Sequence, residues 1–251
     1  MKIEITDLIF SYDNLSTVLN NLNLHCDNNH TIALVGASGC GKSTFLRLCC
    51  GILPNSKHQS LIGNLTINGK EPSELVKNGQ VGFMFQEPAL FPNLTVWENI
   101  ILPLKLHKTP GASARTQELI DKVGLSEYAK FLPDQLSGGM KTRVSLARTF
   151  ITKPRLLLLD EPFSSLDIKW KFLLYRELET FISEYRPMVI MVTHDITEAL
   201  LLSNHIFVFG KNGSILKELR ISKALPRVFQ EDSLKELQGE YFEIQGLIMN
   251  N

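Results

Sequence analysis

Residues 36–44 read Gly36-Ala37-Ser38-Gly39-Cys40-Gly41-Lys42-Ser43-Thr44. The apolar run Thr31-Ile32-Ala33-Leu34-Val35 comes directly before this stretch, and Phe45-Leu46-Arg47-Leu48 follows it. That order predicts a strand, then a glycine-rich loop, then a helix. It matches the pattern G-x-x-x-x-G-K-[ST] in the context that this pattern requires. We therefore expect an α/β fold built around this loop.

The chemistry of the loop indicates that it binds phosphate groups. Gly36, Gly39 and Gly41 can adopt backbone angles closed to other residues, so successive N–H groups can turn toward one anion. The helix that follows adds unpaired N–H groups and the positive end of its dipole. Lys42 is placed to reach the β- and γ-phosphates of a nucleotide, and the Ser43 hydroxyl is placed to bind Mg²⁺. The stretch thus predicts a nucleotide-binding protein.

Composition narrows the class of protein. The chain has 251 residues, 44% of them hydrophobic and 21% charged, which suffices for one large domain or two small ones. Its 26 basic residues balance 26 acidic ones, whereas a nucleic-acid-binding chain has a basic excess or stripe. The alternating, acid-bearing start favours a strand over a signal peptide. No run approaches the roughly 18 apolar residues that cross a bilayer, so any spanning is expected from other chains.

Three further apolar runs of strand length end in side chains that can take part in catalysis. They are 80–85 before Gln86, 155–159 before Asp160 and Glu161, and 187–193 before His194. Parallel strands buried on both faces have such continuous apolar sequences. Ligands bind at the carboxyl edge of an open α/β sheet, so the pair Asp160–Glu161 favours a site over a solvated face. A lone histidine after a strand is typical of a turn or cap, but at this edge His194 becomes a candidate.

Helices are expected between the first and second of these strands. They cover 95–106 and 113–123, and Thr95 with Glu98 three residues later forms a capping box. Ser137 is placed as the N-cap of another helix. Taken alone, the Ser-Gly-Gly sequence that starts there indicates only a loop.

Together, these motifs resemble those of the ATP-binding cassette (ABC) ATPases, the nucleotide-binding subunits of ABC transporters, over about residues 1–221. By this resemblance Gly36 to Thr44 form the Walker A loop, Leu156 to Asp160 the Walker B strand, and Leu136 to Met140 the signature motif between them. Gln86 is similar to the Q-loop glutamine, Glu161 to the catalytic glutamate, Ser165 to Asp167 to the D-loop, and His194 to the switch histidine. Tyr12 is similar to the aromatic residue that stacks on adenine. The signature sequence distinguishes this family from other P-loop enzymes.

The resemblance implies ATP hydrolysis with ATP and Mg²⁺ bound. Lys42 would neutralise the phosphates, Glu161 would polarise the attacking water as general base, and His194 would contact the γ-phosphate. Ser43 and Gln86 would hold Mg²⁺, with Asp160 acting through water. The residues implied to contact nucleotide are Tyr12, Gly36, Ala37, Ser38, Gly39, Cys40, Gly41, Lys42, Ser43, Thr44, Ser137, Gly138, Gly139 and Asp167. Of these, Ser137 and Gly139 would complete the site of a second copy in a head-to-tail dimer.

The expected fold class is α/β: a P-loop NTPase core with an N-terminal antiparallel β layer and an inserted helical subdomain. An ABC ATPase domain is expected over 1–221, with its core at 1–87 and 151–221 and the helical subdomain at 88–150. The remaining residues, 222–251, are expected to form a tail that carries a helix. Its apolar side chains available to pack on the core are Leu225, Val228, Phe229, Leu234 and Leu237.

Two stretches, 85–99 and 160–167, look most like those of bacterial importers of the nitrate, sulfonate, taurine and thiamine-precursor group. This implies membrane-spanning permease partners, an indirect external solute-binding protein, no nucleic acid, and a peripheral place at the cytoplasmic face of the inner (plasma) membrane. We expect the apolar cluster Leu90, Phe91, Leu94 and Trp97 to border a groove for a short permease helix. The permease and the binding protein choose the solute, so this chain alone does not name it.

The alternative function is that of a soluble ABC ATPase in DNA repair or translation. Such proteins usually carry a long coiled-coil insertion or two cassettes in one chain. Here about fifty residues separate Gln86 from Ser137, and there is one cassette. A small-molecule kinase is disfavoured by the signature motif, and an exporter half is disfavoured because exporters commonly fuse their membrane domain.

Overall fold

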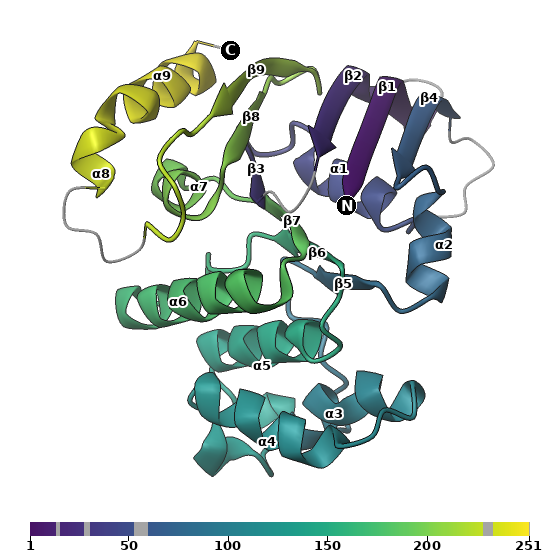
Figure 1. The fold of residues 1–251 in the computed structure, drawn as a ribbon, viewed down its shortest axis with the longest axis vertical. Helices are drawn as coiled ribbons and strands as arrows, with labels where there is room; N and C mark the ends of the chain where they lie inside the picture. Colours follow the sequence, from purple (N-terminus) through teal and green to yellow (C-terminus); the bar gives the residue numbers. More distant parts are fainter. Residues whose placement is uncertain (14–15, 28–30, 53–59, 228–232, 251) are drawn as a thin grey trace.

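The computed structural model describes residues 1–13, 16–27, 31–52, 60–227 and 233–250. Within these residues, two sheets form the upper part of the molecule and a group of helices forms its lower end (Figure 1). The small sheet lies beside the large one; the C-terminus lies at the top of this view and the N-terminus at the lower end of the small sheet.

The large sheet has the strand order β5-β6-β7-β3-β8-β9. Its strands are β3 (Thr31–Gly36), β5 (Val81–Met84), β6 (Leu156–Asp160), β7 (Met188–Val192), β8 (His205–Phe209) and β9 (Ile215–Arg220). Neighbours pair in parallel, except that β9 runs antiparallel to β8. Four of these strands, β3, β6, β7 and β8, are buried along their whole length, which explains their continuous apolar sequences. The predicted α/β class is confirmed.

The small sheet is antiparallel and comprises β1 (Lys2–Ser11), β2 (Thr17–Asp27) and β4 (Ser60–Ile67) in the order β2-β1-β4. The run from Asn64 to Gly69 predicts a strand that ends in a turn, but β4 starts earlier, at Ser60, and ends at Ile67. Its first half pairs with the end of β1 across an irregularity at Gly63, whose φ is 89°. A side chain there would lie 2.3 Å from the carbonyl oxygen of Asp7, so only glycine fits.

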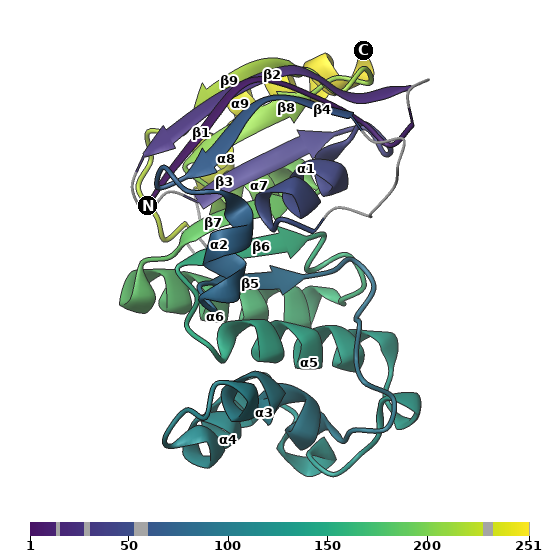
Figure 2. The same ribbon diagram turned by 90° about the vertical axis from the view of Figure 1, so that its right-hand side faces the viewer.

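The two faces of the large sheet pack against different layers. Side chains that alternate along the strands divide into two cores, with Ile32 and Leu34 in one and Ala33 and Val35 in the other. The first core also holds the small sheet and α1 (Lys42–Cys49), which packs between the sheets (Figure 2). The second holds α5 (Gly138–Phe150), α6 (Ile168–Tyr185) and α7 (Ile196–Leu202). The helix that follows the phosphate loop is thus fixed from both sides.

The lower end of the molecule consists of α3 (Val96–Leu106), α4 (Ala112–Lys122) and the outer side of α5 (Figure 2). The capping box is present, because Thr95 Oγ1 accepts from Glu98 N at 3.2 Å and Glu98 Oε2 accepts from Thr95 N at 2.9 Å. The short α2 (Pro72–Lys77) lies between the small sheet and β5. Helices α3, α4 and α5 begin within one residue of their predicted positions, and α3 and α5 each begin at a side-chain N-cap.

The last residues of the chain form α8 (Ser233–Glu236) and α9 (Gln238–Met249). Of the apolar side chains expected to pack on the core, Leu237 is buried and Leu225 is half-buried. The expectation is wrong for Leu234 in α8, which is 44% exposed. Val228 and Phe229 lie outside the described residues. Across the described ranges, no helix has both the length and the apolar character needed to cross a bilayer.

Candidate functional site

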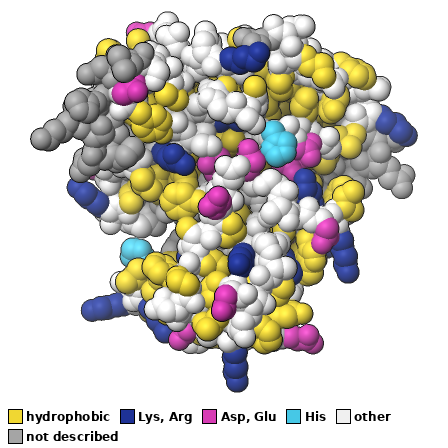
Figure 3. Space-filling model, turned by 180° about the vertical axis from the view of Figure 1, so that it is seen from behind, with side chains coloured by type: hydrophobic (Ala, Val, Ile, Leu, Met, Phe, Trp, Pro, Cys, Tyr) yellow, Lys and Arg dark blue, Asp and Glu magenta, His cyan; other side chains and the backbone are white. Residues whose placement is uncertain are grey.

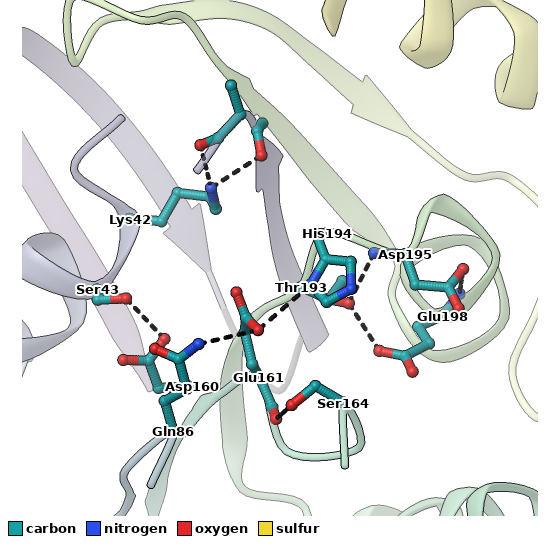
Figure 4. A network of polar contacts seen from close by, with 12 residues as sticks. Lys42, Ser43, Gln86, Asp160, Glu161, Ser164, Thr193, His194, Asp195 and Glu198 are labelled. Carbon is teal, nitrogen blue, oxygen red and sulfur yellow. Dashed lines mark hydrogen bonds and ion pairs between the residues drawn. The ribbon is translucent and has the colours of Figure 1, made fainter. Parts of the chain in front are cut away.

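Four parallel strands bring their carboxyl ends to one edge of the large sheet, and the candidate residues follow them. Lys42 and Ser43 come after β3, Gln86 after β5, Glu161 after β6, and His194 after β7. Figure 4 shows these side chains converging from separate strands on one small region. On the surface, acidic side chains gather beside a histidine near the middle of one face (Figure 3). Strand topology therefore assembles the site from distant parts of the sequence.

The phosphate loop holds its lysine at the centre. The Lys42 ammonium donates to the carbonyl oxygens of Gly36 at 2.9 Å and Ala37 at 2.8 Å, and the side chain is only 5% exposed. Gly41 is the N-cap of α1 with a φ of 98°, and an added side chain would lie 2.7 Å from Leu19 Cδ2. The conformation therefore requires glycine at this point. It places a positive charge and the start of a helix in one concave loop.

A surface cavity of about 390 Å³ opens in front of this loop. It is lined by Tyr12, Val18, Ser38, Gly39, Gly41, Lys42, Ser43, Thr44, Gln86 and Glu161. The Tyr12 hydroxyl lies 3.0 Å from Thr44 Oγ1, and its ring packs edge-on against Phe10. Cys40 is buried behind the loop and does not line the cavity. The cavity thus joins an aromatic surface, a phosphate-type loop and a carboxylate.

Oxygen atoms suited to a divalent cation lie beside the loop. Ser43 Oγ donates to Asp160 Oδ1 at 2.8 Å, and the Gln86 amide lies at the same end of the sheet. Burial raises the pKa of Asp160, and the nearby charge of Glu161 adds to this, while the Ser43 hydrogen bond opposes it. A hydroxyl, one carboxylate and an amide oxygen form a donor set that Mg²⁺ accepts when phosphate and water supply the other ligands. The residues present therefore fit Mg²⁺.

Glu161 has a backbone conformation that is unusual for its residue type. Its φ is 47°, and its N–H donates to the carbonyl oxygen of Val192 at 3.0 Å, across from β6 to β7. Left-handed angles are costly for residues other than glycine and cluster at functional sites. The conformation turns the carboxylate toward two partners, His194 Nδ1 at 3.3 Å and Gln86 Nε2 at 3.2 Å (Figure 4). The sequence carries no signal of this conformation.

Not all predicted nucleotide-contacting residues line the cavity. Ser137 caps α5 by accepting from Met140 N at 3.3 Å, and Gly138 and Gly139 form the first turn of that helix. Gly139 lies near Leu166, which directly precedes Asp167, the N-cap of α6. These residues are absent from the lining of the cavity around Lys42. Within one chain they form a separate cluster.

The structure adds a set of residues that sequence reasoning missed. Glu198 of α7 is 2% exposed and accepts hydrogen bonds from Lys171 Nζ, Tyr175 Oη and Thr193 Oγ1 at 2.7 to 2.9 Å. The sequence does not predict this role for Glu198, because a single acidic residue on a short helix is typical of a solvent-exposed face. Its signal was its place in the first turn of the helix that follows β7, close to the sheet edge.

Comparisons with known proteins agree with this geometry. A family model described as ABC transporter matches residues 19–164. The ABC transporter ATP-binding protein YtlC of Bacillus subtilis is 35% identical over 235 residues, covering 92% of this chain and 88% of its own. The aliphatic sulfonates import ATP-binding protein SsuB 1 of Xanthomonas axonopodis pv. citri is 40% identical over 214 residues, covering 84% of this chain and 82% of its own.

A solved structure is also similar. It is the dimeric post-hydrolysis state of the ATP-binding cassette MJ0796 bound to ADP and Pi. It superposes with a TM-score of 0.77 at 27% identity, over 88% of this chain and all of the other. The likeness therefore extends over most of this chain rather than the phosphate loop alone.

Proposed function

The chain belongs to the ABC transporter ATP-binding family, and on that premise we propose that it hydrolyses ATP at the cavity around Lys42 and Glu161 to power a bacterial importer. The observation that carries this proposal is the convergence of Lys42, Ser43, Gln86, Glu161 and His194 at one sheet edge. The alternative, a soluble repair or translation ATPase, is not favoured, because relatives of similar length are named as import proteins.

The chain's own residues account for the hydrolysis of ATP. The loop N–H groups and Lys42 hold the phosphates and neutralise their charge. Glu161 is the general base: its carboxylate accepts a proton from the water that attacks the γ-phosphorus. His194, whose Nδ1 lies 3.3 Å from that carboxylate, keeps it oriented and would contact the γ-phosphate. Ser43 and Gln86 would hold Mg²⁺, with Asp160 acting through water, and the ion would offset the negative charge of the phosphate oxygens.

We further propose that a second copy of the chain completes the site. Ser137 and Gly138 are exposed at the first turn of α5, and no atom lies within 4 Å of the position of a Gly138 side chain. A helix start of this kind offers free N–H groups to an anion. In a head-to-tail dimer this turn and Asp167 of one copy would face the Lys42 cavity of the other, with ATP between them.

The experiment is steady-state ATP hydrolysis by the full chain over a wide range of protein concentration. A composite site requires two chains, so the rate should rise more than linearly with concentration. Gel filtration without ATP should give a monomer, because the proposed interface is filled by ATP itself. Strictly linear activity down to low concentration would contradict the composite site, and an absence of hydrolysis at every concentration would contradict the ATPase itself.

The membrane partner is proposed to dock beside Gln86. A cavity of about 370 Å³ is lined there by Arg47, Phe85, Gln86, Glu87, Ala89 and Asp160. Phe85 and Phe91 are 36% and 48% exposed, which is high for large apolar side chains, while Leu90 and Trp97 pack partly against the core. Exposed apolar side chains that flank a cavity favour binding of an apolar helix. We propose that a short permease helix binds there, at the cytoplasmic face of the membrane.

The class of solute is proposed from the relatives. Several are named as aliphatic sulfonates import proteins, while others are named for sulfate/thiosulfate or for spermidine/putrescine. We propose organic sulfonates as the first class to test. Deletion of the gene should abolish growth with an alkanesulfonate as the only sulfur source and should leave growth on cysteine unchanged. Unimpaired growth on the sulfonate would exclude this class.

A further inference from the structure

Glu198 is a buried carboxylate that accepts hydrogen bonds from three side chains. Lys171 Nζ and Tyr175 Oη, both from α6, donate to Oε1 at 2.9 Å each. Thr193 Oγ1, at the end of β7, donates to Oε2 at 2.7 Å. A buried carboxylate is costly without such partners, and a fully satisfied polar network is rigid. Glu198 therefore ties together α6, α7 and the end of β7.

The same network encloses the turn that carries His194. Thr193, directly before it, is held by Glu198 through its hydroxyl, and that hydroxyl oxygen accepts from Asp195 N at 3.0 Å. Asp195, directly after it, caps α7 by accepting from Thr197 N at 2.9 Å and lies 3.7 Å from Lys171 Nζ. Hydrogen bonds thus fix both neighbours of His194 (Figure 4). The imidazole itself is 60% exposed, so the turn, and not side-chain packing, determines its place.

We propose that Glu198 is a positioning residue for ATP hydrolysis: it fixes residues 193–195 and thereby the placement of His194 against Glu161. It touches neither the nucleotide cavity nor the reacting atoms. The inference rests on the proposed function, because it concerns the same reaction. Stability alone does not explain the network well, since apolar residues of similar volume commonly stabilise a core as much as a buried ion pair does.

The variants that test this role differ in what they remove. Glu198→Ala removes both acceptor oxygens and frees the turn. Glu198→Gln keeps the side-chain shape and one acceptor oxygen, so it should retain part of the function. Ile120→Ala, in α4, is the matched control, because it creates a cavity in a fully buried region outside the nucleotide site. Thermal unfolding of the three full-length variants establishes how much stability each one loses.

The decisive measurement compares the change in kcat with the change in the Kd for Mg-ATP. We expect Glu198→Ala to lower kcat for ATP by on the order of 10²-fold, because small misplacements of catalytic groups have effects of this size. Its Kd for Mg-ATP should stay within about twofold, because Lys42 and the loop are untouched, and Glu198→Gln should lie between Ala and the unmodified chain. Ile120→Ala should keep its kcat at a similar loss of melting temperature. A kcat for Glu198→Ala equal to that of Ile120→Ala would overturn the proposal.

A parallel measurement on Glu161→Gln separates this inference from the proposed function. If Glu161→Gln and Glu198→Ala are both slow with Mg-ATP binding intact, the proposal holds. If Glu161→Gln is inactive while Glu198→Ala turns over normally, only the positioning role is wrong. If Glu161→Gln turns over at the unmodified rate, the assigned reaction site fails, and the Glu198 proposal fails with it.

Discussion

The imidazole Nδ1 of His194 lies 3.3 Å from Oε2 of Glu161, and the pairing of two adjacent parallel strands sets this distance. Asp160 at the end of β6 pairs with Val192 at the end of β7, so the residues that follow each strand emerge side by side. The backbone hydrogen bond from Glu161 N to Val192 O reinforces the register. A change in either strand's register would therefore separate the proposed base from the residue that orients it.

Glu161→Gln should lower ATP hydrolysis by about 10²–10⁴-fold, the usual contribution of general-base catalysis. The change keeps size and hydrogen bonding but removes the proton acceptor. Binding should persist, because Lys42, Ser43 and the loop amides still hold the phosphates. Loss of an anion beside the γ-phosphate also removes a repulsion, so gel filtration with Mg-ATP should show a long-lived dimer for this variant and mostly monomer for the unmodified chain.

Lys42→Ala is the control variant for the gel filtration of Glu161→Gln. It should lose nucleotide affinity and dimerisation together, because the central cation of the loop is gone. A Glu161→Gln chain that hydrolyses ATP at the unmodified rate would place the base elsewhere, and His194 would be the next candidate.

Much of this arrangement was accessible from the sequence. The phosphate loop, the buried strands and the capping box at Thr95 are encoded by residues close together in the chain, and their physics is local. The convergence of Gln86, Glu161 and His194 was predictable as well, because parallel strands end at one sheet edge. The roles of these residues stay predictions that the variants above test.

The features that the sequence did not reveal depend on long-range packing. The early start of β4 requires a partner strand and an irregularity opposite Asp7. The left-handed backbone of Glu161 is imposed by the neighbouring strand. The donors to Glu198 come from α6 and β7, so no local window contains the network. In each case the information lies in pairs of residues far apart in the chain.

Asp160→Asn should raise the melting temperature of the nucleotide-free chain while abolishing Mg-ATP hydrolysis. The pKa of Asp160 is raised in the folded state, chiefly by burial, so the folded chain binds its proton more tightly than the unfolded chain does. The protonated carboxyl therefore favours the folded state. This contribution is fully present below the pKa of Asp160 in the unfolded chain, and it is lost as pH rises through the higher pKa of the folded chain. At neutral pH the buried charge is therefore a cost, and asparagine removes it while still accepting from Ser43.

Thermal unfolding of Asp160→Asn and the unmodified chain across pH 3–8 measures this effect. The difference between them should grow toward neutral pH and shrink in acid. A variant that is less stable than the unmodified chain at pH 7 would contradict the assignment of Asp160 as a destabilising buried charge.

Leu90→Glu should abolish co-purification of the permease from detergent-solubilised membranes and leave Mg-ATP binding intact, because a charge in an apolar groove opposes helix docking. Leu90 packs partly on the core, so the substitution also perturbs the fold. Phe91→Glu, at a 48% exposed position, is the second variant and should cost little stability. If both variants retain the permease at the unmodified level, the docking surface lies elsewhere.

Arg227→Lys should loosen the C-terminal tail without changing the affinity for Mg-ATP. Arg227 is fully buried, and its guanidinium donates to the carbonyl oxygens of Leu200 at 2.7 Å and Ser203 at 2.5 Å, which end α7. It also donates to the carbonyl oxygen of Lys223, so one side chain caps a helix and holds the tail. Burial lowers the pKa of Arg227 to about 10, which leaves it charged at neutral pH.

A lysine ammonium cannot span these acceptors as the planar guanidinium does. Leaving one buried carbonyl without a donor costs about 1–3 kcal/mol, which corresponds to a fall of about 2–12 °C in melting temperature for a chain of this size. Arg220→Lys is the matched control: its side chain is 71% exposed beside Glu218, so this substitution should shift the melting temperature by about 1 °C or less. Equal melting temperatures for the two variants would mean that Arg227 does not hold the tail, whereas a lower value for Arg227→Lys with unchanged nucleotide affinity assigns it that role.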